Sequence, residues 1–145
     1  MVLLMRRLIG PVLLLMGLPL GMAQQTAVPT FVIERPTIIA FFPPMTDAEL
    51  DKNPDMNEVL GDFQLYASQA SPGLKKAGVD FKVATALRFR VNNGGVVTTF
   101  KTGKIKVGYY FVAPGKPAHV EYGVMTDIDM LARAKKYFDM PVTAP

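Results

Sequence analysis

Hydrophobic and polar positions change their spacing several times along the chain, and each spacing predicts a different element. Thr37 to Phe42 (TIIAFF) form a continuous apolar run that Pro43-Pro44 ends, which is typical of a strand buried on both faces at the centre of a sheet. Over residues 55–70, apolar side chains recur every three or four positions, which predicts an amphipathic helix. We expect Ser71-Pro72-Gly73 to interrupt this helix before one further turn, which ends at Gly78.

A second strand follows the helix, because apolar and polar residues alternate over residues 79–84. A strand, a long helix and a strand joined in this order predict a right-handed βαβ unit with parallel strands. Alternation resumes at 87–91, and Asn92-Asn93-Gly94-Gly95 is a strong turn signal before residues 96–100, which together predict a hairpin whose Arg88 and Arg90 face water. The pattern leaves open whether this hairpin belongs to the main sheet.

The remaining predicted elements lie after residue 104 and before residue 36. Residues 105–113 predict another strand, and a Pro-Gly-Lys-Pro turn leads to an antiparallel partner over 118–124. Thr126-Asp127-Ile128-Asp129 is similar to a helix-capping box and opens a final helix that runs to about Phe138. Phe31 to Ile33 predict a short edge strand. The predicted order after that edge strand is strand, helix, strand, hairpin, strand, strand, helix.

The first residues have the layout of an export signal. Arg6 and Arg7 precede an apolar stretch from Leu8 to Leu20, and Gly21-Met22-Ala23 supplies a small-x-small cleavage site. The alternative, an uncleaved anchor, needs about 20 apolar residues, whereas this stretch is shorter and is interrupted by glycines and prolines. We therefore expect an exported protein, periplasmic or extracellular, with no stable membrane anchor once the signal is cleaved. Export could follow either the general secretory or the twin-arginine route. The predicted organisation is a cleaved signal over 1–23, a mobile segment over 24–35, a folded domain over 36–140 and a tail over 141–145.

Composition excludes several classes of chemistry. The 145 residues contain no cysteine, no tryptophan and one histidine, which excludes disulfides, thiolate nucleophiles, iron–sulfur clusters and cysteine-bound zinc. Charge is uneven, because residues 47–62 are mainly acidic and residues 75–106 mainly basic. A basic flank can bind nucleic acid or anionic lipid. Here the bases alternate with apolar residues, as they do on a solvated sheet face, and we predict no nucleic-acid partner.

The polar residues form no recognisable catalytic or metal site. His119 and Glu121 share one face of a strand, but two ligands are too few for zinc, so a surface pair is the simpler interpretation. Acidic and polar residues alternate over 47–55 as in a calcium loop, yet the EF-hand order is absent and acids ahead of a helix suit its dipole. We predict no catalytic residue, no metal and no cofactor. Three tyrosines could stack a ligand or pair across strands without one: Tyr109, Tyr110 and Tyr122.

The order of elements, the buried run at 38–42 and the strand Gly108 to Val112 with its Pro-Gly-Lys turn together resemble the thioredoxin-like fold superfamily. The resemblance implies an α/β fold with a thioredoxin-like mixed sheet, built from a βαβ unit, an inserted β-hairpin and a ββα unit, with helices packed on it. The redox residues of that superfamily are missing. Residues 43–49 hold no Cys-x-x-Cys, Gly108 stands where the cis-proline is expected, and Thr46 with Glu49 replaces the Thr-x-x-Cys of peroxiredoxins.

Two classes of function fit these residues. The first is an exported binding or accessory module, without thiol redox activity, that binds a protein partner in the cell envelope. The second is a thiol-independent enzyme or a small-ligand carrier that uses the corner where the thioredoxin active site would lie. We favour the first, and a pocket lined by convergent polar groups at that corner would favour the second. The candidate ligand-binding residues at the corner are Pro43, Pro44, Met45, Thr46 and Gly108.

Overall fold

The computed structural model describes residues 28–140, so the expected signal over 1–23 and the tail over 141–145 lie outside the described residues. The elements follow the predicted order, with one additional short helix, α3. In chain order they are β1 (Thr30–Ile33), β2 (Thr37–Phe42), α3 (Asp47–Asp51), α4 (Pro54–Lys76), β3 (Asp80–Thr85), β4 (Arg88–Asn93), β5 (Val96–Lys101), β6 (Gly108–Val112), β7 (His119–Tyr122) and α5 (Asp127–Phe138).

The main sheet has four strands in the order β3-β2-β6-β7. Strand β2 pairs in parallel with β3, which confirms the predicted parallel pairing of the βαβ unit, and it pairs antiparallel with β6 on its other edge. Strand β7 returns antiparallel to β6, with Tyr110 opposite Val120. The chain is therefore a mixed α/β protein, as predicted. The apolar run of β2 is continuous because the strand has a partner on each side and a packed layer on each face.

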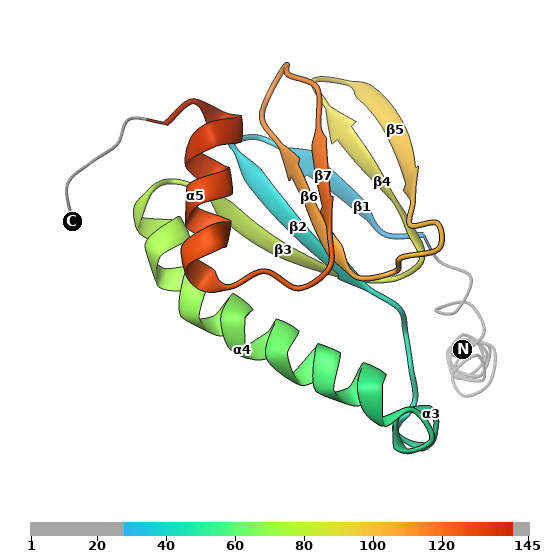
Figure 1. The fold of residues 1–145 in the computed structure, drawn as a ribbon. Coiled ribbons are helices and arrows are strands. Elements are labelled where there is room, and N and C mark those ends of the chain that lie inside the picture. The colour runs from blue at the N-terminus through green and yellow to red at the C-terminus, as the bar shows by residue number, and fades with distance from the viewer. Residues whose placement is uncertain (1–27, 141–145) are drawn as a thin grey trace, which may run out of the picture.

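Helices α4 and α5 lie together on one face of the main sheet (Figure 1). Ile38 and Ala40 of β2 point toward them and join a core that includes Phe63 of α4 and Met130 of α5. Their strand neighbours Ile39 and Phe41 point the other way, into a second core. The two-residue side-chain period of a strand thus divides one apolar run between two hydrophobic layers.

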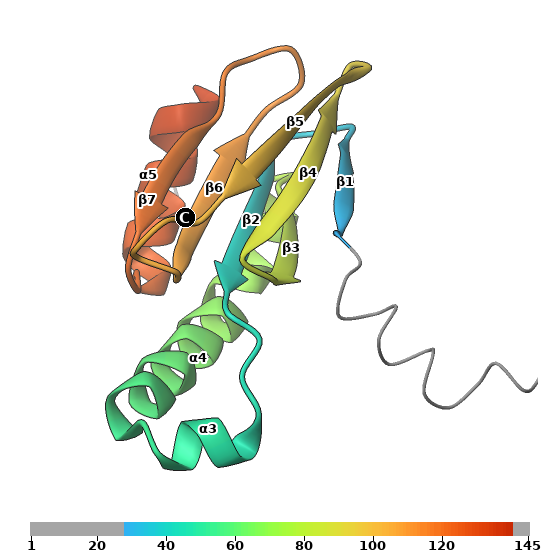
Figure 2. The same cartoon turned by 90° about the vertical axis from the view of Figure 1, so that its right-hand side faces the viewer.

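The predicted hairpin, β4 and β5, does not extend the main sheet. It forms a separate small sheet with β1 in the order β1-β4-β5, and β1 pairs in parallel with β4. Figure 2 shows this small sheet on the face of the main sheet opposite the helices. Phe89 and Val91 of β4 face inward and are fully buried or nearly so, and they pack against Phe41 and Tyr110 of the main sheet. The protein therefore has three layers: helices, main sheet and small sheet.

Strand β1 belongs to the folded body of the protein. It lies within residues 24–35, where we expected a mobile segment ahead of the folded domain. Ile33 is buried in the second core, and Phe31 meets Phe89 edge to face with ring centroids 5.7 Å apart. The backbone of Arg90 donates to the carbonyl of Pro29 at 2.8 Å. The folded part of the chain therefore begins before residue 36, because β4 needs a partner on its second edge.

Helix α4 runs without a break from Pro54 to Lys76, so the predicted interruption at Ser71-Pro72-Gly73 is wrong. Proline inside a helix removes one backbone hydrogen bond and opposes helix geometry by about 3 kcal/mol. Packing on both sides of Pro72 offsets this cost, since Ala70 and Leu74 are both fully buried. Gly73 also brings α4 close to α5, because a Cβ built there would lie 3.5 Å from a methyl group of Leu131.

Candidate functional site

The predicted corner begins where β2 ends. Pro43 is buried, Met45 is half-buried, and Pro44 and Thr46 are exposed. Thr46 is the N-cap of helix α3, and its hydroxyl accepts a hydrogen bond from the backbone of Glu49 at 3.1 Å. The Glu49 carboxylate accepts in return from the Thr46 backbone at 2.9 Å. The polar groups of Thr46 are therefore engaged in capping a helix.

Helix α3 is absent from the order of elements that the sequence analysis predicts. The signal was present, because Thr46-Asp47-Ala48-Glu49 has the S/T-x-x-E spacing of a capping box. We compared these residues with a peroxiredoxin motif instead. Two acidic residues of α3, Asp47 and Glu49, lie in its first turn, where they suit the helix dipole.

Gly108 has a structural reason to be glycine. It opens β6, where a Cβ would meet the backbone oxygen of Glu121 at 2.5 Å and the ring of Phe41 at 2.8 Å. Gly108 is buried between β7 and the Phe41 ring, and any side chain at this position would collide with its neighbours. None of the five predicted residues lines either of the two hollows described below.

An apolar hollow of about 470 Å³ lies beside Gly108, and Val107, the preceding residue, helps to line it. Met56 and Val59 of α4 form one wall. The other wall comes from the segments that precede β6 and follow β7. Ile105 and Val124 line it and are 56% and 38% exposed, so apolar surface is open to solvent here. The remaining lining residues are Lys104, Lys106, Val107 and Gly123.

A second hollow, of about 410 Å³, opens between the two sheets, and we call it the inter-sheet cleft. Its small-sheet wall is formed by the inward face of β4 and β5, including Val91 and Thr98. Its main-sheet wall is formed by β6 and by the turn that leads to β7. The residues of this second wall are Tyr110, Val112, Gly115, Lys116, Pro117 and Ala118, and the small-sheet wall also includes Asn93 and Val96.

The side chain of Asn93 fixes the end of the inter-sheet cleft. Its amide nitrogen donates to the carbonyl of Ala113 at 3.0 Å and to that of Lys116 at 3.4 Å, and its oxygen accepts from the backbone of Gly115 at 3.0 Å. One side chain of the β4–β5 hairpin thus holds the β6–β7 turn in place. From the sequence we assigned Asn93 only to a turn, because nothing local shows which distant backbone an amide will meet.

The three tyrosines do not form one ligand platform. Tyr109 is fully buried on the helix side, stacked on Phe63 at 5.1 Å, and its hydroxyl accepts from the backbone of Met125. Tyr110 lies on the opposite face of the sheet, in the second core. Tyr122 is 47% exposed. Adjacent strand residues point to opposite faces, so consecutive tyrosines cannot stack on the same ligand.

His119 and Glu121 face helix α5. The His119 ring stacks on Tyr137 with centroids 4.3 Å apart, and Arg133 Nε lies 3.2 Å from a Glu121 oxygen. Tyr137 donates its hydroxyl hydrogen to Glu121, and this hydrogen bond, together with burial, raises the pKa of the Tyr137 phenol above its usual value. These contacts fasten β7 to α5. Within residues 28–140, no three side chains of the metal-binding types converge on one point.

Comparison with known proteins adds no assignment: no protein-family model, no curated protein and no solved structure matches the chain. Over the same described residues, no helix has the length and apolar character needed to cross a membrane.

Proposed function

We propose that this chain is an exported, thioredoxin-like protein without thiol redox activity, and that it binds a protein partner of the cell envelope at the inter-sheet cleft. Export rests on the layout of residues 1–23, with two arginines, an apolar stretch and a small-x-small site. A thiol reaction is excluded by composition, because the chain has no cysteine.

The arrangement of the main sheet supports the thioredoxin-like interpretation. A βαβ unit (β2, α4, β3) and a ββα unit (β6, β7, α5) share one mixed sheet, in the order β3-β2-β6-β7, with both helices on one face. A βαβ unit and a ββα unit on one mixed sheet are what the resemblance implies for residues 36–140. The small sheet occupies the opposite face, and the connection from β3 to β6 runs through its hairpin.

The inter-sheet cleft is the observation that carries the binding function. The main sheet continues to β7, whereas the small sheet ends at β5. Apolar surface of the cleft therefore stays open along β5, where Val96 is 69% exposed. Proteins use such apolar surface beside a polar rim to bind other proteins.

The apolar hollow beside Gly108 supports a second candidate function, a carrier of a small hydrophobic anion. Apolar side chains line most of it, and Lys104 and Lys106 stand at its edge as cations. It lies next to the predicted corner, but Thr46 and the prolines do not line it. A long-chain carboxylate has the matching chemistry, with an alkyl chain for the hollow and a charge for a lysine.

Peptide selection followed by NMR mapping tests the first candidate. The protein purified from the exported fraction is panned against a phage-displayed library of random peptides, and the selected peptides are titrated into isotope-labelled protein. We expect backbone shifts to cluster on cleft residues such as Thr98 and Ala118. The variant Ala118→Phe, which fills the cleft, should weaken binding roughly tenfold, about 1.4 kcal/mol.

The matched control is Ala132→Phe, which adds the same ring on an exposed position of α5 and should bind as the wild type does. Shifts confined to other surfaces would contradict the cleft as the binding site. Titration with dodecanoate separates the second candidate, because that ligand should shift Ile105 and Val124 and leave Thr98 unchanged.

A further inference from the structure

The two sheets have four edge strands among the described residues, and β5 differs from the other three. Strands β1 and β7 have four residues each, and β3 carries Lys82 in its middle. Strand β5 has six residues and contains no proline and no charge before its final Lys101. Natural proteins usually blunt a sheet edge with short strands, prolines or charges to prevent further pairing. The β5 edge lacks these protections.

Hydrogen bonds of the small sheet show which backbone groups of β5 are free. The Thr102 backbone N–H donates to the Leu87 carbonyl at 3.0 Å. Leu87 and Thr102 therefore form a hydrogen-bonded pair that continues the β4–β5 ladder by one position. Hydrogen-bonded and non-hydrogen-bonded pairs alternate along an antiparallel ladder. The pair Arg90–Thr99 is therefore non-bonded, which agrees with the Arg90 backbone donating toward β1. The backbone groups of Val97, Thr99 and Lys101 consequently point to the open edge.

The space beside this edge lies over part of the main sheet. An added strand next to β5 would lie above β7. Val120 of β7 faces the small-sheet side, because it pairs with Tyr110 of the second core. Tyr122, which pairs with Gly108, faces the same side. Its inward side chains would enter the inter-sheet cleft beside Thr98. Strands in a sheet are about 4.8 Å apart, so one extra strand continues the layer without moving β5.

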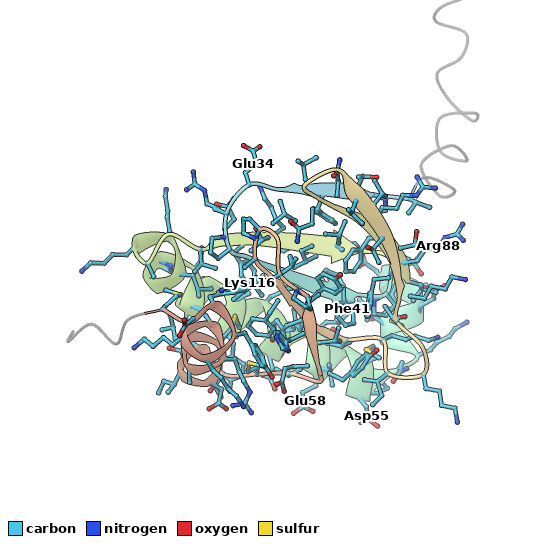
Figure 3. The ribbon with its side chains drawn as sticks, turned by 90° about the horizontal axis from the view of Figure 1, so that it is seen from above. Glu34, Phe41, Asp55, Glu58, Arg88 and Lys116 are labelled. Atoms are coloured by element: carbon cyan, nitrogen blue, oxygen red, sulfur yellow. The ribbon has the colours of Figure 1, made fainter. Side chains whose placement is uncertain are left out.

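The charges around the edge favour an acidic occupant. No acidic residue occurs between Asp80 and Glu121, whereas Arg88, Arg90 and Lys101 lie on the outer face of the hairpin, at exposed positions. None of these three cations takes part in an ion pair among the described residues. Figure 3 shows Arg88 projecting into solvent on the hairpin side, with Asp55 and Glu58 on the opposite, helix side.

We propose that the free edge of β5 binds an extended acidic segment of another protein as an added strand. The segment alternates acidic side chains, which face the outer cations, with apolar side chains, which fill the inter-sheet cleft. Strand addition supplies main-chain hydrogen bonds to Val97 and Thr99, and alternate side chains supply specificity. This proposal rests on the proposed function, since it identifies the partner and binding mode at the same cleft.

Designed peptides test the proposal directly. The probes are fluorescein-labelled ten-residue peptides that alternate Glu with Val or Lys with Val, and a Glu–Val peptide methylated at every second backbone nitrogen. Fluorescence anisotropy measures their affinity for the exported protein. We expect the Glu–Val peptide to bind at least roughly tenfold tighter than the Lys–Val peptide and to weaken as salt is raised. Backbone methylation should weaken it by a similar factor, because it blocks one hydrogen-bonding edge.

The variant Thr99→Pro removes one outward N–H without removing a hydrogen bond to β4, and prolines are tolerated at such edge positions. It should abolish binding of the Glu–Val peptide while circular dichroism and the urea midpoint remain near those of the wild type. Thr30→Pro is the matched control, because it makes the same change on β1, the far edge of the same sheet. That variant should bind normally.

Each alternative outcome has a distinct meaning. If library-selected peptides occupy the cleft but charge and backbone methylation make no difference, strand addition by an acidic segment is overturned and the binding function stands. If no peptide of any kind shifts the cleft residues, both proposals fail. If sedimentation shows a dimer that Thr99→Pro dissociates, a second copy of the chain occupies the edge, and the proposed acidic partner is rejected.

Discussion

Replacing Gly108 by alanine tests whether this residue is needed for packing, which is the role the structure gives it. The new Cβ would lie 2.5 Å from the backbone oxygen of Glu121 and 3.0 Å from the Cα of Tyr122. Both atoms belong to the backbone of β7, which is held in register by four paired residues. The Cβ would also lie 2.8 Å from the Phe41 ring, which is fully buried and packed against Phe89 and Phe100.

The expected loss of stability follows from how little these neighbours can move. A ring at the end of a flexible side chain could rotate away, but two backbone atoms can separate only if β6 and β7 shift apart. Overpacking a core by one methyl group destabilises by about 1–3 kcal/mol. Because two of the closest contacts are with backbone atoms, we expect Gly108→Ala to destabilise the protein by about 3 kcal/mol, at the upper end of this range. That is a large part of the roughly 5–15 kcal/mol that stabilises a typical domain.

Gly61→Ala is the matched control, because it makes the same chemical change where no atom lies within 4 Å of the new Cβ. Gly61 is exposed in the interior of α4, where alanine favours the helix by roughly 0.5–1 kcal/mol. The two substitutions should therefore change the free energy of unfolding in opposite directions. Urea denaturation followed by far-ultraviolet circular dichroism measures both, with tyrosine emission as a second probe because the chain has no tryptophan.

The result that refutes this reasoning is a Gly108→Ala variant that loses less than about 1 kcal/mol with an unchanged urea dependence. Such tolerance would mean that the strands separate easily at this point. Gly108 would then again be available as a ligand-contact residue at the predicted corner.

Four further predictions concern export, chemistry and packing. The exported protein should begin at Gln24, and mass spectrometry that finds an intact Met1 would contradict the signal assignment. Purified protein should show no disulfide reductase activity with insulin and no peroxidase activity, since both reactions need a thiolate and the chain has no cysteine; turnover that persists through further purification would refute this. Asn93→Ala should destabilise by about 1–2 kcal/mol in urea, because it leaves the Gly115 N–H and two carbonyls without their partner, and a change near zero would show that water replaces the amide without loss. Ile39→Asp should cost several kcal/mol and leave little folded protein by circular dichroism, because Ile39 is fully buried in the central strand; a cooperative melt near the wild-type midpoint would be inconsistent with that burial.

The main sheet was predictable because its strands differ in hydrophobic pattern. The run at β2 is apolar at every position after Thr37, so it had to be central, and proline residues at both ends set its length. The helical period before β3 and the Asn-Asn-Gly-Gly turn between β4 and β5 are equally local signals. Gly94 and Gly95 both have positive φ, as the two central residues of a type I′ hairpin turn require.

Two local expectations failed for opposite reasons. The break expected at Pro72 did not occur, because burial of the flanking turns of α4 against the sheet and α5 outweighs the missing hydrogen bond. Helix α3 was missed although its capping box is visible in the sequence at Thr46 and Glu49. In the first case tertiary packing overrides a local preference, and in the second the local signal was given a different interpretation.

The candidate site was the least predictable feature. The corner with Thr46 and Gly108 was placed by resemblance, and the structure engages Thr46 in a helix cap and encloses Gly108 between strands. The inter-sheet cleft depends on where the hairpin packs. The alternation of β4 shows that one of its faces is buried, but an alternating pattern does not identify the surface that buries it.

The sequence by itself determined the chemistry that is absent and the local elements, because both depend on residue identity and on short-range spacing. It excluded thiol reactions through the lack of cysteine, and it placed the buried strand, the long helix and the hairpin. Only the tertiary structure decided that the hairpin leaves the main sheet, pairs with β1 and ends in a free edge at β5. The physical reason is that hydrophobic burial is non-directional, so the pairing of strands far apart in the chain is settled by the packing of whole layers.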